Sequence, residues 1–453
     1  MSEHYGKHFV AIIGGSVAGS EAAHILARRG YRVVVFEQRK LPYGKIEDGL
    51  PKWHIGLRNK EEKAIDERLN HENIRFVPCT RLGKDITLNE LIHEWGFSAV
   101  ILAIGAWQDR TLPIQGIQKF HHSGLIYQNE FIMWFNHYHE PDYEGIQIPI
   151  SDGAAIVGGG LASLDVVKAM MILTVQEALR TRDIDADLFT LEKKGIKSVL
   201  DDHNLSFKDL SIKPCTLFYR REAADMPLKA KKDDSPASSE QARRVSAQLL
   251  AKYKEKYMFN FEPLTIPLGF STEDGNVSEI QFQRVRQEGR KLVPIEGDVL
   301  HYPTELIISS IGSIPENLNS VPSQDELIDT HGELSCRVAG FDNVFAIGNA
   351  VTGRGNILES KRHGRNTTEQ IIDTHLDPLA EKFKDWFDDV KSGVTENVDE
   401  ISRALENAAV QSDDIIEGIL DKSRKLQVEA GYNSSYRDWI KAHTPVRLED
   451  LIN

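Results

Sequence analysis

The chain has 453 residues, of which 41% are hydrophobic and 27% charged, a composition typical of a globular protein with two or three domains. Its formal net charge of −14 argues against nucleic-acid binding, because neutralising phosphates requires a surplus of Lys and Arg. No apolar run approaches the ~18 residues that cross a bilayer, and the first residues show no targeting pattern, so we expect a cytoplasmic protein without a membrane partner.

The residues FVAIIGGSVAGSEAAHILARRGYRVVVFE, 9–37, have the strand, glycine-turn, helix and strand order of a dinucleotide-binding unit. Gly14 permits the tight turn and Gly19 lets the helix pack close to the sheet, while Ser16 replaces the second glycine of the fingerprint and offers a hydroxyl that could donate to a phosphate. Glu37 follows Gly14 by 23 residues, the distance at which a carboxylate accepts hydrogen bonds from a ribose. The unit therefore favours FAD or NAD over NADP.

A second segment, AAIVGGGLASLDVV at 154–167, repeats the pattern of the first. The segments AVILAIG (99–105) and LIISSIG (306–312) also match each other, and both predict buried parallel strands that end at an Ile-Gly turn. Two unrelated buried strands with glycine turns are the alternative. The pairing of both motifs favours two nucleotide-binding domains instead.

The second unit is expected to select a phosphorylated nucleotide. Gly158 and Gly160 fit the fingerprint, and Ser163 takes its third position. The strand KPCTLFYRRE ends in Arg220 and Arg221, whose guanidiniums are suited to bind a 2′-phosphate, so NADP(H) is favoured. A solvated strand end is the plainer interpretation of this pair. Since 62 residues separate Gly158 from Arg220, a helical insertion at 171–213 is expected between the strands.

The predicted fold is α/β, with two Rossmann-like domains, the second inserted in the first, and a helical C-terminal extension. The segment beginning NVFAIGNA supplies another buried strand and returns the chain to the first domain. KAKKDDSPASSEQ, 229–241, is expected to be an exposed loop. The predicted ranges are 1–110 and 330–375 for the FAD domain, 111–329 for the NADP domain and 376–453 for the extension.

Longer segments resemble one family, the adrenodoxin reductases and related bacterial ferredoxin–NADP reductases, with the glutamate synthase small subunit as a more distant relative. They include GGSVAG, LPYGKIEDGLPKWH, LGKDITLNEL, VILAIGAWQDRTLPIQG, VGGGLASLDVVK, YRRE, IISSIG, GRGNI and the C-terminal YRDWIKAHTPVRLEDLI. The resemblance implies FAD and NADP(H) as cofactors, with His54 near the flavin and Asp165 approaching it. The hypothesis for this catalytic pair is that it shuttles protons or fixes the nicotinamide, and a structural histidine is the alternative.

Besides the catalytic pair His54 and Asp165, motifs and resemblance together predict two sets of cofactor-binding residues. The FAD set is Gly14, Ser16, Ala18, Gly19, Glu37, Lys45, Ile86, Gly105, Gly348, Asn349, Gly355, Asn356 and Ile357. The NADP set is Gly158, Gly160, Leu161, Ala162, Ser163, Arg220, Arg221 and Gly355. Asn349 and Asn356 depart from the family pattern, and the glutamate that the family carries near Lys232 is not clearly preserved.

The expected reaction carries a hydride from NADPH to the flavin and then single electrons to a ferredoxin-like iron–sulfur protein. The alternatives are an electron-transfer subunit that feeds a partner enzyme and an NADPH-dependent flavin reductase of a small molecule. Basic residues that would attract an acidic carrier are Lys229, Lys231, Lys232, Arg243, Arg244, Lys361, Arg362 and Arg365, although an ordinary solvated face is an equally good interpretation. The sequence does not indicate the oligomeric state.

No metal site is predicted. The histidines His121, His122, His137 and His139 are interpreted as surface residues. Cys79, Cys215 and Cys336 are far apart and form no C-x-x-C pair, so packing roles are expected in place of a disulfide, zinc or dithiol centre.

Overall fold

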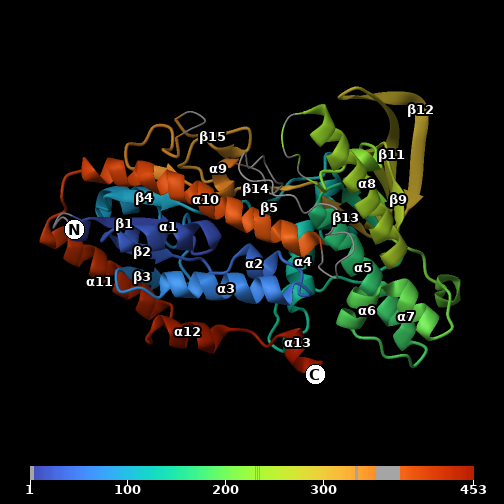
Figure 1. Cartoon of the computed structure of the whole chain (residues 1–453), viewed down its shortest axis with the longest axis horizontal. Coiled ribbons are helices and arrows are strands. Elements are labelled where there is room, and N and C mark those ends of the chain that lie inside the picture. Colours follow the sequence, from blue (N-terminus) through green and yellow to red (C-terminus); the bar gives the residue numbers. More distant parts are fainter. Residues whose placement is uncertain are drawn as a thin grey trace.

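The computed structural model describes residues 5–452 apart from 230, 232, 234, 332–334 and 353–377. Two α/β halves lie side by side, and the helix α10 extends along the first half toward the second (Figure 1). No helix among the described residues is long and apolar enough to cross a membrane.

The first half is built on a parallel five-stranded sheet in the order β17-β4-β1-β2-β3. Its strands are β1 (Phe9–Ile13), β2 (Arg32–Phe36), β3 (Ile74–Val77), β4 (Ala99–Leu102) and β17 (Val344–Ala346). Every residue of β1 and β4 is buried, as continuous apolar strands in a parallel sheet require. The helices of this half are α1 (Val17–Arg28), α2 (Lys45–Asp48), α3 (Ile55–Leu69) and α9 (Asn349–Thr352).

The second half has its own parallel sheet, in the order β6-β13-β7-β8-β9. Its strands are β6 (Leu125–Tyr127), β7 (Ala155–Gly158), β8 (Thr216–Phe218), β9 (Asn260–Glu262) and β13 (Ile307–Ser310). Between β7 and β8 run α5 (Leu161–Arg180), α6 (Leu188–Lys194) and α7 (Ile196–Asp202), which confirms the predicted helical insertion. The helix α4 (Gln128–His137) follows β6.

The chain leaves the first sheet after β4, builds the second sheet and returns to the first at β17. This order confirms the predicted insertion of one α/β unit in the other. The two crossings pair with each other as the antiparallel strands β5 (Gln108–Asp109) and β14 (Ser313–Ile314). The domain boundaries near residues 110 and 330 stay predictions.

Two features of the second half differ from the expectation. An antiparallel meander of β10 (Thr265–Glu273), β11 (Asn276–Glu288) and β12 (Lys291–Pro303) precedes β13, and no segment of the sequence was assigned to it. The predicted loop at 229–241 is wrong in its second part, because α8 (Pro236–Tyr257) begins there. Ser235 caps this helix by accepting from the Ser238 N–H, and proline is favourable in the first turn.

The C-terminal helices are α10 (Pro378–Glu406), α11 (Asp413–Glu429), α12 (Tyr436–His443) and α13 (Leu448–Leu451). Phe387, Val394, Val398 and Ile401 of α10 are buried in the core that the first sheet forms with α1. The extension is therefore part of the first half's core. Short elements complete the described fold: 3-10 turns at Tyr5–Lys7, Ile117–Phe120, Phe207–Leu210 and Ala223–Asp225, a π-turn at Glu90–Glu94, and a hairpin of β15 (Ser323–Gln324) and β16 (Leu327–Ile328).

The three cysteines are not joined to one another. Cys215 and Cys336 are buried, in agreement with packing roles. Cys79 is exposed and has a positive φ of 55°, so the packing role predicted for it is wrong.

Candidate functional site

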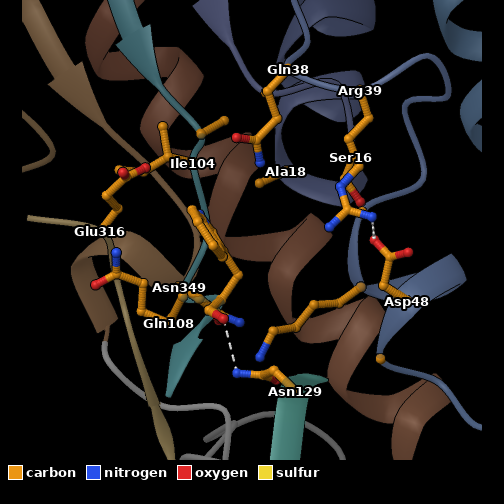
Figure 2. A pocket seen from close by; sticks show the side chains of 18 of the residues that line it. Ser16, Ala18, Gln38, Arg39, Asp48, Ile104, Gln108, Asn129, Glu316 and Asn349 are labelled. Carbon is orange, nitrogen blue, oxygen red and sulfur yellow. Dashed lines mark hydrogen bonds and ion pairs between the residues drawn. The ribbon is translucent and has the colours of Figure 1, made fainter. Parts of the chain in front are cut away.

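A cavity of about 540 Å³ lies at the carboxyl ends of the first sheet's strands. In Figure 2, Ser16, Ala18 and Arg39 border one side of it, while Gln108 and Glu316 border another. Of the predicted FAD residues, those that line this cavity are Gly14, Ser16, Ala18, Glu37, Lys45, Gly105 and Asn349. Ligands of open α/β sheets bind at this edge, so the cavity has the expected place for a nucleotide.

The glycine turn after β1 has no room for side chains. A Cβ on Gly14 would lie 2.6 Å from the carbonyl oxygen of Ala103, and a Cβ on Gly19 would lie 1.8 Å from that of Gly14. Gly14 also has a φ of +99°, which favours glycine. The turn and the helix α1 are thus packed as the dinucleotide fingerprint requires, and the fit supports the roles predicted for both glycines.

The Ser16 hydroxyl makes a hydrogen bond within the protein, and its contact with a phosphate stays a prediction. It donates a 2.7 Å hydrogen bond to the carbonyl oxygen of Tyr43, so this proton is already used within the protein. Ser16 is the N-cap of α1 but its side chain makes no capping bond. The first N–H groups of α1 consequently face the cavity end of the helix without a side-chain cap, an arrangement suited to an anion such as a pyrophosphate.

Glu37 lies at the end of β2, as predicted, and is almost fully buried in the cavity wall. Its two carboxylate oxygens accept hydrogen bonds from the Gly15 N–H at 2.9 Å and the Arg39 N–H at 3.0 Å. Burial raises the pKa of the carboxyl, and the two N–H donors oppose this. Each oxygen keeps a further lone pair for a ligand hydroxyl.

Four polar residues, Lys45 among them, meet in a group that sequence motifs did not single out. The Lys45 ammonium lies 3.1 Å from the Ser313 hydroxyl, which in turn accepts from the Asn129 side-chain amide at 3.0 Å. The backbone N–H of Asn129 donates to Asp109 at 3.1 Å. Burial lowers the pKa of Lys45 to about 8 and raises that of Asp109 to about 7.

A second cavity, of about 660 Å³, opens at the carboxyl ends of the second sheet. The predicted NADP residues that line it are Gly158, Gly160, Leu161, Ala162, Ser163 and Arg220. A Cβ on Gly158 would lie 2.2 Å from the Ser163 hydroxyl oxygen, so this turn is also closed to side chains. The Ser163 hydroxyl bonds that of Ser310 on β13 at 3.0 Å and thereby ties α5 to the sheet.

The two arginines predicted for a 2′-phosphate differ in position. Arg220 is exposed and lines the second cavity. Arg221 donates through Nη2 to the carbonyl oxygen of Arg290 at 3.0 Å and is not among the described residues that line the cavity. The structure thus separates the pair into one cavity residue and one residue that contacts the turn between β11 and β12.

The two cavities share a wall. The residues that border both are Lys45, Gly49, Asn129, Asn349, Trp386 and Phe387. Trp386 and Phe387 come from α10, which the sequence placed only in a helical extension. Their helical spacing could indicate a buried face, but nothing in the sequence shows what that face contacts. Two ligands held in these cavities would therefore meet at one junction.

His54 and Asp165 are both buried, and Trp53 contacts His54 and Lys168, which follows Asp165 on α5. Asp165 is buried on α5 and lines the second cavity. His54 is also buried and accepts a 3.1 Å hydrogen bond at Nε2 from the Trp53 indole N–H, so its Nδ1 carries the proton of the neutral ring. Lys168, one turn after Asp165, lies over the Trp53 ring at 4.1 Å. A relay between His54 and Asp165 stays a prediction.

The remaining predicted residues fall into three groups. Gly348 has a φ of +69°, and a Cβ there would lie 2.9 Å from Ala18. Ile86 is buried and pairs with Leu82, which lines the first cavity, while Ile86 itself is not among its described lining residues. Outside the described residues lie Lys232, Gly355, Asn356, Ile357, Lys361, Arg362 and Arg365.

The histidines divide into exposed and buried ones. His121 and His122 are exposed, as predicted, and both contact Glu130. His137 is mostly buried, so its interpretation as a surface residue is wrong. It lies 2.6 Å from Glu140 and 3.3 Å from Asp48, and hydrogen bonds to these two carboxylates raise its pKa to about 9 although burial lowers it.

Comparison with known proteins agrees with these features. Residues 8–182 match the family model Pyridine nucleotide-disulphide oxidoreductase. The chain is 26% identical over 334 residues to a Schizosaccharomyces pombe protein named Probable NADPH:adrenodoxin oxidoreductase, mitochondrial, covering 67% of this chain and 68% of that one. It is also 26% identical over 383 residues to a Mycobacterium tuberculosis glutamate synthase [NADPH] small chain, covering 81% and 66%. These matches confirm the family resemblance that the sequence predicts.

Solved structures extend the likeness to the fold. The structure of Mycobacterium tuberculosis FprA in complex with NADPH superposes with a TM-score of 0.66 at 18% identity, covering 93% of this chain and 91% of that one. The likeness confirms the predicted two-unit α/β fold. The chain spans about two thirds of the length of the two curated relatives named above, and half or less of several others.

Proposed function

We propose that this chain is an FAD-containing oxidoreductase that moves electrons between NADPH and a one-electron iron–sulfur carrier. One observation carries the proposal: two cavities, each behind its own glycine turn, share a wall that includes Lys45, Asn129 and Trp386. Hydride transfer between two nucleotide cofactors requires their reactive rings to meet, and this junction offers that place.

FAD fits the first cavity because its turn excludes side chains at Gly14 and Gly19, and Glu37 offers acceptors to a ribose without tolerating a 2′-phosphate. NADP(H) fits the second cavity, where Arg220 is placed to pair with a 2′-phosphate. When bound, the flavin supplies the conversion between a hydride and single electrons.

The protein's own contribution is to position the two cofactors and to shield their reactive rings from water. Trp386 and Phe387 provide apolar surface at the junction, which excludes water from the reacting rings. Lys45 and Asn129 are fixed by Ser313, so their donors are oriented before a ligand arrives. Asp165 lines the second cavity, and His54 accepts a hydrogen bond from Trp53. We infer that this pair accepts and donates protons near the nicotinamide.

A partner of the ferredoxin type would be attracted by basic groups near the second cavity. Arg243 forms an ion pair with Asp225, which reduces its value for a partner, while Lys231 and Arg244 are exposed. An electron-transfer subunit that serves a larger enzyme is the second candidate, because the likeness to a glutamate synthase small chain covers 81% of this chain.

The purified chain with FAD tests the proposal. We expect yellow protein whose absorbance is bleached faster by NADPH than by NADH, followed by cytochrome c reduction that depends on added ferredoxin. Bleaching without ferredoxin-dependent reduction across several ferredoxins would favour the subunit role. Protein that stays colourless and does not retain added FAD would contradict the whole proposal.

For the His54–Asp165 pair, stopped-flow flavin reduction by NADPH over a pH series is the readout. His54→Gln and Asp165→Asn are each expected to shift the pH profile of the reduction rate, because each removes a titratable group from the pair. An unchanged profile in both variants would show that the pair does not handle protons.

A further inference from the structure

A cluster of two histidines and a glutamate lies outside the nucleotide turns, after the 3-10 turn at 117–120. The Nε2 atom of His121 lies 2.7 Å from one carboxylate oxygen of Glu130, and that of His122 lies 3.0 Å from the other. One ligand atom from each residue lies within 4.8 Å of those of the other two. Among the described residues, this is the only such group of three His, Cys, Asp or Glu side chains.

The backbone holds the two imidazoles together. His122 has a φ of +68°, an uncommon conformation for a residue with a side chain, and its N–H donates to the Leu125 carbonyl at 2.9 Å. In this conformation consecutive rings lie on the same side, with centroids 3.9 Å apart, although successive side chains of an extended segment point to opposite sides. The His121 ring also packs edge-on against Tyr127 at 5.3 Å.

Glu130 is fixed independently of the histidines. It lies in the first turn of α4, where its carboxylate accepts from the Tyr127 N–H at 2.6 Å and completes the capping box of that helix. The carboxylate is held by the helix while both histidines converge on it from the preceding loop. The three groups are therefore arranged before any ligand binds, which reduces the ordering cost of binding.

We propose that His121, His122 and Glu130 bind one divalent transition-metal ion of the Zn²⁺ type. Neutral imidazole nitrogens and a carboxylate oxygen are the donors that Zn²⁺ accepts. The ion would take the place of the Nε2 contacts to Glu130, with the single N–H of each neutral ring on Nδ1, which leaves Nε2 free to bind the metal. His121 and His122 are 39% and 47% exposed in their side chains, which leaves an entry path and open positions for water.

This site adjoins the first cavity, because His121 and Glu130 also line it. An ion bound here would place positive charge at that cavity's rim. The binding itself does not depend on the proposed function, since all three ligands belong to this chain and none of them needs a cofactor.

Isothermal titration of the metal-free full-length chain with ZnCl₂ tests the proposal. We expect one Zn²⁺ per chain and no displacement by Mg²⁺, which prefers oxygen ligands. His122→Ala and Glu130→Gln are each expected to weaken binding by about tenfold or more, since even the loss of an outer-shell partner costs that much. Glu130→Gln keeps a side-chain oxygen that can accept from the Tyr127 N–H.

The matched control is His301→Ala, because His301 of β12 contacts a single carboxylate, that of Glu279 on β11, at 3.0 Å and is not part of the cluster. This variant should retain the affinity of the unmodified chain. Absence of saturable 1:1 binding, or equal losses in the His301 and His122 variants, would overturn the proposal. Circular dichroism of each variant before titration separates lost binding from lost folding.

Discussion

Lys45, in the wall that both cavities share, contacts Ser313 on the strand that leads from the second half of the molecule back to the first. The Lys45 ammonium, at the start of α2, lies 3.1 Å from the Ser313 hydroxyl on the returning strand β14. Asn129 of α4 donates to the same hydroxyl at 3.0 Å, so one serine gathers side chains from three elements. This polar junction is the feature from which the first prediction follows.

Asp109 should make stability depend on pH. Burial raises its pKa from 3.8 to about 7, so the folded chain binds a proton that the unfolded chain has released between these two values. The unfolding free energy should therefore fall as pH rises from about 4 to 7 and lose no more from this group above pH 7. Asparagine does not titrate, so Asp109→Asn should lack this loss, which in the original chain amounts to as much as about 4 kcal/mol of unfolding free energy at pH 7.

Urea denaturation of the flavin-free chain between pH 5 and 8 measures the effect as the difference between the original chain and the variant. Asp142→Asn, at an exposed aspartate, is the control. Its unfolding free energy should differ from that of the original chain by the same amount at every pH. A parallel pH dependence in the original chain and Asp109→Asn would show that Asp109 does not hold its proton.

Arg220 should contribute more to NADPH selectivity than Arg221. Arg220 lines the second cavity, whereas Arg221 donates to the Arg290 carbonyl. A hydrogen bond to a charged group contributes about 1.5–3 kcal/mol, so Arg220→Ala should raise the Kd for NADPH by roughly 10- to 100-fold with little effect on NADH. Fluorescence titration with both nucleotides checks this. Equal weakening of NADH would place the 2′-phosphate elsewhere.

Ser163→Ala should destabilise the second half modestly. The hydroxyl is fully buried and bonds Ser310 at 3.0 Å, and loss of one such bond costs about 0.5–1.5 kcal/mol. Thermal unfolding with Ser434→Ala as the exposed control would show the difference. No change in Ser163→Ala would mean that the hydrogen bond which Ser310 donates to the Gln128 side-chain oxygen is enough to satisfy Ser310.

Arg447 should anchor the C-terminal segment to α2 and α3. Its guanidinium pairs with Glu47, and it also lies 2.9 Å from Glu62. All three side chains are largely buried, so Arg447→Ala leaves the Glu47 carboxylate without its arginine and should cost about 3–5 kcal/mol. Denaturation of this variant against the exposed control Lys441→Ala checks the value. Equal stability of the two would show that water replaces the arginine.

Much of the fold was predictable because glycine turns and continuous apolar strands are local signals. The strands β1, β4, β7 and β13 follow from their residues, and the long helical insertion follows from the spacing of Gly158 and Arg220. The meander β10-β11-β12 was not predicted, because its half-exposed strands carry a polar, weakly alternating pattern. Each of these strands can be recognised only together with the strands that pair with it.

The positions of Glu37, Lys45 and Arg220 on the cavity walls were predictable, but contacts were predictable only where a residue acts through the backbone. Gly14, Gly19 and Gly158 lie where the motif predicted them, since each position has no room for a side chain and only glycine meets that requirement. The Ser16 hydroxyl and Arg221 make contacts that depend on residues far along the chain, Tyr43 and Arg290, so their sequence neighbours could not reveal them.

The helix α10 has a consequence for any attempt to shorten this protein. Trp386 and Phe387 form part of both cavity walls, and Phe387 is also buried in the core of the first half. A chain cut before Pro378 would keep both glycine turns yet lose one side of each nucleotide compartment. A minimal version of the protein must therefore include α10, although neither glycine turn lies in it.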